Sequence, residues 1–209
     1  MRKNTRYIIM AIICLTAFAV NSFAVTLLTE EAALKEMFPD CDEVVTTTHE
    51  MTADEIAKVK ERMGGNLVHF QDGSKSGNVA EQTKYNFYIG MKGGEKIRMA
   101  VMEAQPGKWG PVQFVVAIDV KTEKVNNLAV MMYVEKRGRP IARKNYLKQF
   151  IGKGSSDAIS VRSKKGVRRD IRAVSGATIS SDCTCFAVRK VVALFDEVYK
   201  KNLVAALAK

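Results

Sequence analysis

The chain has 209 residues, of which 47% are hydrophobic and 26% are charged, and its formal net charge is +11. This composition, with few prolines and no low-complexity tract, is typical of a folded globular domain and excludes a disordered or fibrous protein. The length indicates a single domain.

The first two dozen residues differ in character from the rest. A basic N-terminus is followed by an almost unbroken apolar stretch at residues 7–20, and small residues precede Val25 as at a signal-peptidase site. We expect residues 1–24 to be a signal peptide and residues 25–209 to be the folded domain. An N-terminal membrane anchor is the alternative, although the stretch is shorter than the roughly 20 residues of a spanning helix. In both cases the folded part is expected on the periplasmic or extracellular face of the cytoplasmic membrane.

The folded part remains basic when the signal peptide is set aside. Long-range electrostatics should draw such a domain to anionic partners. Acidic electron-transfer proteins, or peripheral contact with the anionic headgroups of a membrane, suit an exported protein, whereas nucleic acid does not. The alternative is that the basic surface binds no partner and only keeps the protein soluble.

Helical and extended patterns alternate over the first third of the folded part. Residues 28–38 have the spacing of a short helix that Pro39 ends, and residues 44–50, rich in Val and Thr, predict a strand. Thr52 precedes Glu55 at capping-box spacing, and the helix that follows continues to Met63, before two glycines.

Strand patterns then dominate the middle of the chain, with turn residues between them. The predicted strands cover residues 67–71, 85–91, 97–103, 112–121 and 127–134. After them come a helix at 141–150, a strand near 158–162, a basic loop at 164–169 and a last amphipathic helix at about 179–202. The pattern predicts an α+β fold, an antiparallel meander sheet packed with helices.

The cysteines and histidines do not indicate a metal site or a catalytic centre. Cys183 and Cys185 are two residues apart, so on a helix their side chains point to different sides. We favour buried small side chains, or one thiol paired with Cys41, over a functional dithiol. His49 and His69 lie in strand-like runs and are expected to be ordinary surface or core residues.

The segment at residues 170–181 differs in kind from the rest. A β-like run and a turn of small residues precede a helix that is opened by several hydroxyl side chains. The start of a helix exposes unpaired N–H groups and the positive end of the macrodipole, which together bind phosphate. Gly176 and Ala177 would let a phosphorylated group approach the backbone. Simple capping of the helix by Ser and Thr is the alternative.

The run Ser175-Gly176-Ala177-Thr178-Ile179-Ser180 resembles the flavinylation motif of the FMN-binding domain family. The resemblance extends upstream, to the turn at residues 107–111, to Glu135 and Gly138 after a strand, and to the helix end at residues 146–153. The family includes the C subunit of the sodium-translocating NADH:quinone oxidoreductase and the G subunit of the Rnf complex. It implies a single FMN-binding domain here.

The resemblance also implies the cofactor and its ligands. In this family a flavin transferase uses FAD to attach FMN covalently, through a phosphoester bond, to the threonine that corresponds to Thr178. The residues expected to contact the FMN are Thr178, Ser175, Gly176, Ala177, Ile179, Ser180, Trp109, Glu135 and Gly138. Trp109 is expected beside the flavin ring, with a half-buried core tryptophan as the alternative.

The expected function is transfer of electrons in a membrane-associated or extracytoplasmic respiratory chain. Membrane redox subunits or exported cytochromes would be the electron partners, so the protein is interpreted as an electron-transfer protein or a subunit of an oxidoreductase complex. No acid–base constellation indicates a stand-alone enzyme. Two alternatives stay open: a flavin-dependent extracytoplasmic reductase, and a flavin-free basic binding module.

Overall fold

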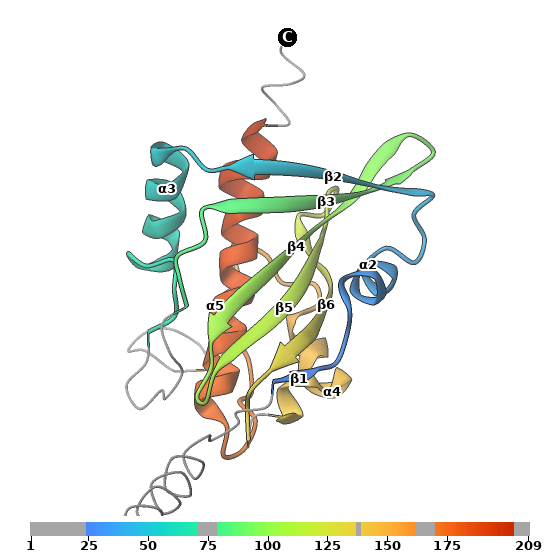
Figure 1. The fold of residues 1–209 in the computed structure, drawn as a ribbon. Helices are drawn as coiled ribbons and strands as arrows, with labels where there is room; N and C mark the ends of the chain where they lie inside the picture. Colours follow the sequence, from blue (N-terminus) through green and yellow to red (C-terminus); the bar gives the residue numbers. More distant parts are fainter. Residues whose placement is uncertain (1–23, 71–78, 137–138, 162–169, 203–209) are drawn as a thin grey trace, which may run out of the picture.

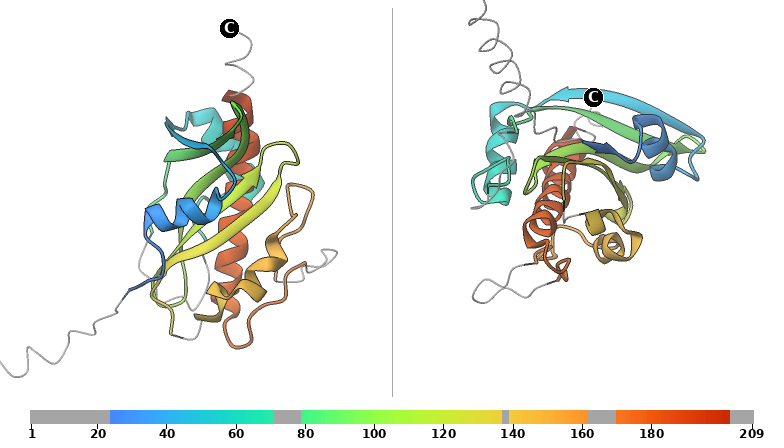
Figure 2. Two further views of the ribbon diagram at one scale, coloured as in Figure 1. Left: turned by 90° about the vertical axis from the view of Figure 1, so that its right-hand side faces the viewer. Right: turned by 60° about the horizontal axis from the view of Figure 1, so that its bottom comes forward.

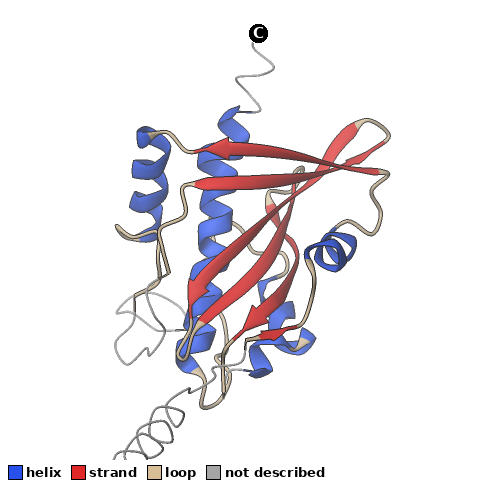
Figure 3. Cartoon of the chain, in the orientation of Figure 1, coloured by secondary structure: helices blue, strands red, loops and turns tan. Residues whose placement is uncertain are grey.

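The computed structural model describes residues 24–70, 79–136, 139–161 and 170–202. It contains a six-stranded antiparallel sheet in the order β1-β6-β5-β4-β3-β2 (Figure 1, Figure 3). The strands are β1 (Val25–Thr26), β2 (Glu43–Glu50), β3 (Lys84–Lys92), β4 (Glu95–Pro106), β5 (Pro111–Asp119) and β6 (Lys124–Tyr133). The α+β class is confirmed, and the run from β3 to β6 is the part of the predicted meander that the structure contains, with β2 added beside β3. The expected signal peptide lies almost wholly outside the described residues.

Helices cover both faces of the sheet. They are α2 (Glu30–Met37), α3 (Ala53–Met63), η1 (Arg139–Ala142), α4 (Lys144–Leu147), η2 (Lys148–Phe150), α5 (Thr178–Leu194) and the π-helical η3 (Phe195–Tyr199). The long helix α5 lies across one face with α3 beside it, and α2 packs on the other face (Figure 2). The segment from η1 to η2 lies near the start of α5.

Alternation of side chains along the strands produces two cores. On β4, Met99 and Val101 face the α5 side, whereas Ala100 faces α2. On β5, Phe114 faces α5 and Val115 faces α2 in the same way. This period of two is the reason why the sheet can bury apolar residues on both faces.

Helix α3 begins where the sequence predicts, directly after Thr52. The Thr52 side chain accepts a hydrogen bond from the Glu55 N–H, the Glu55 carboxylate accepts one from the Thr52 N–H, and α3 ends at Gly64 with a φ of 78°. Glu55 also contacts the His49 ring, with 2.9 Å between Nε2 and Oε2. His49 therefore has a structural partner at the start of α3.

Two predicted strands are wrong. Residues 67–70 are irregular, because the Gln105 side chain on β4 binds the Leu67 carbonyl and accepts the His69 N–H, in place of a neighbouring strand. Residues 158–161 are also irregular, since Ile159 has a φ of 40° and the Ala158 N–H binds Asp170. The remainder of these two ranges, and the basic loop at 164–169, lie outside the described residues. Strand β1, which pairs with β6, was not predicted.

A buried ion pair joins the sheet to α5. The Lys190 ammonium, on α5, lies 2.9 Å from a Glu103 carboxylate oxygen on β4, and both side chains are almost fully buried. Gln105 and Tyr85 also donate hydrogen bonds to Glu103. Burial raises the pKa of Glu103, while the Lys190 ammonium acts in the opposite direction. This network fixes α5 against the sheet.

Within the described part of the chain, none of the helices has the length and apolar character needed to cross a membrane.

Candidate functional site

The predicted phosphate-binding turn lies directly before α5. Ala177 donates its N–H to the Val174 carbonyl, Gly176 has a φ of 72°, and Thr178 is the first residue of the helix. A positive φ of this size is a conformation that glycine adopts without strain. The Thr178 side chain is exposed. The turn therefore presents the Thr178 hydroxyl at the start of α5, the longest helix among the described residues.

Among the described residues, no hydroxyl side chain caps α5. The N-cap residue is Ala177, and this position makes no side-chain capping hydrogen bond. The Ser181 hydroxyl accepts the Val174 N–H instead, which holds the preceding strand-like segment, and the Ser180 hydroxyl points to Glu135. The first-turn N–H groups of the helix thus have no cap from Ser or Thr, so helix capping does not explain the hydroxyl-rich sequence.

Glu135 joins three segments that are distant in sequence. One of its carboxylate oxygens accepts the N–H groups of Lys108 and Trp109, at 2.6 and 3.1 Å. The other oxygen accepts the Ser180 hydroxyl at 2.7 Å. The side chain is 3% exposed, so these hydrogen bonds are shielded from water. Glu135 therefore fixes the turn after β4 beside the start of α5.

The close approach of this turn to Glu135 requires a glycine at position 107. A Cβ on Gly107 would overlap Glu135 Oε1, and it would lie 2.9 Å from the Val112 Cγ2 atom. The Gly107 N–H donates to the Gly110 carbonyl, which closes the turn.

A pocket of about 230 Å³ opens between this turn and the helix start. Its lining consists of Lys108, Trp109, Glu135, Gly176, Ala177, Thr178, Ile179 and Ser180. Two ammonium groups lie against the half-buried Trp109 ring: Lys108 Nζ is 5.7 Å and Lys136 Nζ is 4.7 Å from the ring centroid. Helix N–H groups, a hydroxyl and ammonium groups are suited to an anionic ligand such as a phosphate ester.

The structure brings together seven of the nine expected site residues. Ser175 is exposed on the turn but does not line the pocket, and Gly138 lies outside the described residues. Binding of FMN by the seven stays a prediction. Lys108 was not expected in the site, although its position inside the glycine-rich turn before Trp109 was a usable signal.

The two cysteines of α5 are buried and unpaired with Cys41. Cys41, Cys183 and Cys185 are all free thiols, so the alternative of a disulfide with Cys41 is wrong. Burial raises the pKa of the Cys183 thiol, and it raises that of Cys185 to about 12. The Cys183 thiol contacts the Gln105 carbonyl. These cysteines therefore behave as small core side chains, as favoured from their spacing.

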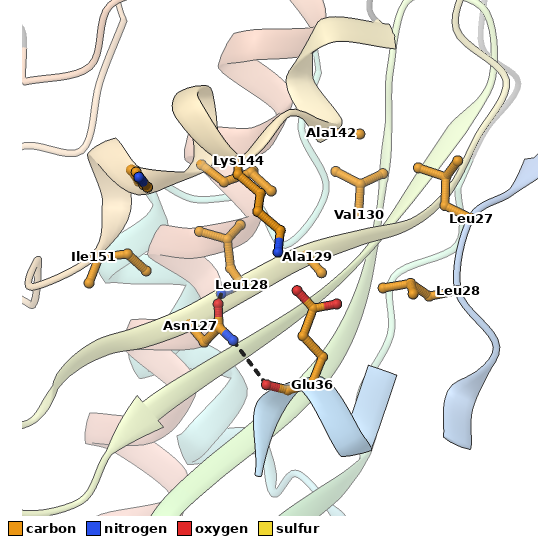
Figure 4. A pocket seen from close by; sticks show the side chains of 12 residues that line it. Leu27, Leu28, Glu36, Asn127, Leu128, Ala129, Val130, Ala142, Lys144 and Ile151 are labelled. Atoms are coloured by element: carbon orange, nitrogen blue, oxygen red, sulfur yellow. Dashed lines mark hydrogen bonds between the residues drawn. The ribbon is translucent and has the colours of Figure 1, made fainter. Parts of the chain in front are cut away.

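A larger hollow, of about 470 Å³, lies away from the turn, between α2, the outer edge of β6 and α4 (Figure 4). Its floor is apolar, with Leu128 and Val130 of β6, and Glu36 and Lys144 lie on its opposite walls. It contains none of the expected site residues.

Comparisons with known proteins identify a related family and a similar fold. The sequence model of the FMN-binding domain family matches residues 107–193, a range that begins at the glycine of the turn and includes the start of α5. A search of curated proteins finds no match. Among solved structures, the chain is similar to the crystal structure of NqrC from Shewanella oneidensis, with a TM-score of 0.51 and 15% sequence identity. The similarity covers 85% of this chain and 90% of that chain.

The likeness to NqrC extends over nearly the whole described fold, and at this identity it concerns the fold alone. The match to the family model includes every pocket residue of the turn, of the β6 end and of the helix start. The chain therefore contains a match to the FMN-binding domain at residues 107–193, a range that holds the whole lining of the pocket.

Proposed function

We propose that the protein is an exported electron carrier whose FMN is attached covalently to Thr178 through a phosphoester bond. The observation that carries this proposal is the exposed Thr178 side chain at the start of α5, inside the pocket and beside first-turn N–H groups that no Ser or Thr side chain caps. A hydroxyl in this place is accessible to a modifying enzyme. The same N–H groups would hold the phosphate once it is attached.

The attachment uses FAD and a flavin transferase. The pyrophosphate bond of FAD breaks, a bond forms between Thr178 Oγ1 and the phosphorus on the flavin side, AMP leaves, and the hydroxyl proton is lost. Oxidation states do not change, and the product is FMN esterified to the protein. The exposed turn at Gly176 allows the transferase to reach the hydroxyl without unfolding the domain.

The residues of the pocket bind and orient the group. Glu135 holds Lys108 and Trp109 against the start of α5, and Trp109 provides an aromatic surface beside Thr178. A pocket of about 230 Å³ is smaller than the roughly 300–1,000 Å³ of closed ligand cavities, so much of the cofactor would lie at the surface. When bound, FMN supplies the electron chemistry, and the protein supplies its position and its electrostatic environment.

The place of the protein in a respiratory chain rests on sequence and similarity. The N-terminal 24 residues have the pattern of a signal peptide, which supports a location outside the cytoplasm. The likeness in fold to NqrC, a subunit of the sodium-translocating NADH:quinone oxidoreductase, supports membrane redox subunits as electron partners. Exported cytochromes are a second class of partner.

The test is intact-mass and peptide mass spectrometry of the exported protein after coexpression with a flavin transferase. We expect an added mass of one FMN less water on the peptide that contains Thr178, and loss of residues 1–24. Thr178→Ala should remove the added mass, whereas the matched variant Thr184→Ser, on the buried part of the same helix, should keep it. An unmodified wild-type protein, or a modification that Thr178→Ala retains, would refute the proposal.

A further inference from the structure

Charge is distributed unevenly over the described surface. Every exposed acidic residue that the structure describes precedes residue 124; these residues lie on or beside α2, β2 and α3 and in the hairpin turns. The acidic residues described after that point are buried or half-buried, and Glu135 is fully occupied by its three hydrogen bonds. After residue 123, the described residues therefore expose positive charge without exposed negative charge.

Part of this positive charge surrounds the pocket. We define the basic rim as Lys108, Lys136, Arg139, Arg143 and Arg172. Lys108 lines the pocket, and Lys136 lies 4.7 Å from the centroid of the Trp109 ring. No ion pair joins any of the five to an acidic residue in the described part of the chain, and four of them are exposed. Lys108 is half-buried.

Hydrogen bonds place the other members of the rim near the start of α5. The Tyr146 hydroxyl, on α4, donates to the Ser181 carbonyl at 3.2 Å, which holds α4 and the preceding Arg143 beside α5. The Gln149 side chain binds both the N–H and the carbonyl of Arg172, at 2.8 and 3.2 Å. Arg139 belongs to η1, which contacts both β6 and α5.

We propose that the basic rim is the docking surface for an acidic redox protein, which exchanges electrons with the cofactor in the pocket. The inference rests on the proposed function. Unpaired charges of one sign around a reactive site attract an oppositely charged partner and orient it during encounter. One electron leaves the centre in one protein and enters the centre in the other, and no bond is made or broken.

A protein fits the rim better than a lipid surface does. Much of the bound cofactor would lie at the surface of a pocket of about 230 Å³, where a redox centre can approach it. A bilayer on the rim would cover the same opening with phospholipid headgroups, which cannot exchange electrons. An anionic membrane is therefore the rival occupant that the experiment must distinguish.

The first arm of the test measures docking without using the cofactor. The ¹⁵N-labelled protein is titrated with oxidised flavodoxin, an acidic protein, and amide shifts are recorded for wild type and for Thr178→Ala. We expect shifts around the rim that high salt abolishes, in both proteins. The charge reversal Lys108→Glu/Lys136→Glu should weaken binding about tenfold.

The matched control is Lys92→Glu/Lys96→Glu, which makes the same change in net charge at the β3–β4 turn. This turn lies at the other end of β4, about 35 Å from the rim along the strand. The control should change the dissociation constant less than about twofold. Shifts at the β3–β4 turn, or equal effects of the two double variants, would overturn the proposal. So would rim-dependent cosedimentation with phosphatidylglycerol vesicles in the absence of shifts from flavodoxin.

The second arm measures electron transfer from the FMN-loaded protein. Reduced protein is mixed with ferricyanide, an anion, or with hexaammineruthenium(III), a cation. The rim variant should slow oxidation by ferricyanide about tenfold and speed oxidation by the cation. Equal changes in the two oxidation rates would refute the proposed role of the basic rim. A protein without FMN would refute the proposed function, while the docking arm with Thr178→Ala would still decide the inference.

Discussion

The Ser180 hydroxyl, on the first turn of α5, donates a 2.7 Å hydrogen bond to Glu135, a buried residue two positions after the end of β6. The same carboxylate accepts the N–H groups of Lys108 and Trp109. One side chain thus determines how the turn after β4 lies relative to Thr178.

Glu135→Gln should lower the free energy of unfolding by about 1.5–3 kcal/mol, the usual contribution of hydrogen bonds to a charged group. The amide oxygen is neutral, so it accepts the two N–H groups more weakly, and the amide nitrogen cannot accept the Ser180 hydroxyl proton. Urea denaturation measures the change. Glu50→Gln, at an exposed position, is the control and should change stability by less than about 0.5 kcal/mol. Equal losses in the two variants would contradict this role of Glu135.

Gly107→Ala should cost more stability than Gly176→Ala. The methyl group at position 107 would overlap the Glu135 carboxylate, whereas a Cβ at position 176 meets no atom within 4 Å. Gly176→Ala therefore carries only the strain of a left-handed residue, about 1–2 kcal/mol. Gly107→Ala should exceed this value and should also shift the Trp109 fluorescence. A smaller loss at position 107 than at position 176 would show that the carboxylate moves aside freely.

Lys190→Met should destabilise the domain by about 3–5 kcal/mol, because it leaves the Glu103 carboxylate buried without a counter-ion. The loss should depend on pH. Without Lys190 the pKa of Glu103 rises further above its ordinary value of 4.5. A carboxyl whose folded pKa is raised favours folding below its unfolded pKa and loses this contribution as pH rises through the folded pKa.

The loss of folding stability caused by Lys190→Met should therefore be larger at about pH 8 than at about pH 5. Thermal or urea unfolding at the two pH values measures it. Lys190→Met/Glu103→Leu removes both charges, so it should recover part of the stability and lose the pH dependence. A deficit that is the same at both pH values would mean that Glu103 is not the group responsible.

The thiols of α5 should resist alkylation in the native protein. Burial raises the pKa of Cys185 to about 12 and also raises that of Cys183, so little thiolate forms and reagents cannot reach it. Cys41 is half-buried and should react first, although burial raises its pKa as well. Iodoacetamide labelling followed by peptide mass spectrometry, with and without urea, distinguishes the three. Rapid native labelling of Cys183 would contradict the packed helix.

The sequence predicted most of the meander and the helices α2, α3 and α5, because each depends on local periodicity and turn residues. The helix expected at 141–150 is instead divided among η1, α4 and η2. Thr52 and Glu55 mark the start of α3 by their spacing alone, and the structure has the capping box there. Residues 67–70 could not be predicted correctly in this way. Their hydrogen bonds go to the Gln105 side chain, a contact across 36 or more positions that no local pattern contains.

The candidate site, too, could be predicted from the sequence only in part. The motif at Thr178 and the turn at Trp109 could be recognised by resemblance, and the structure brings them into one pocket. The contact of Ser180 with Glu135 could not be read from sequence, since it depends on how α5 crosses the sheet. The two-residue strand β1 is too short to produce a periodic signal, and its pairing with β6 appears only in three dimensions.

The open side of β6 affects how the molecules behave at high concentration. β1 pairs with Met132 and Tyr133 only, so the stretch from Asn127 to Val130 has β5 on one side and the hollow on the other. An unpaired strand edge is a template for the same strand of another molecule, and such pairing leads to aggregation. Here the Lys144 side chain lies over this stretch. A second strand would have to dehydrate its ammonium, so the protein should stay dispersed despite an incomplete sheet edge.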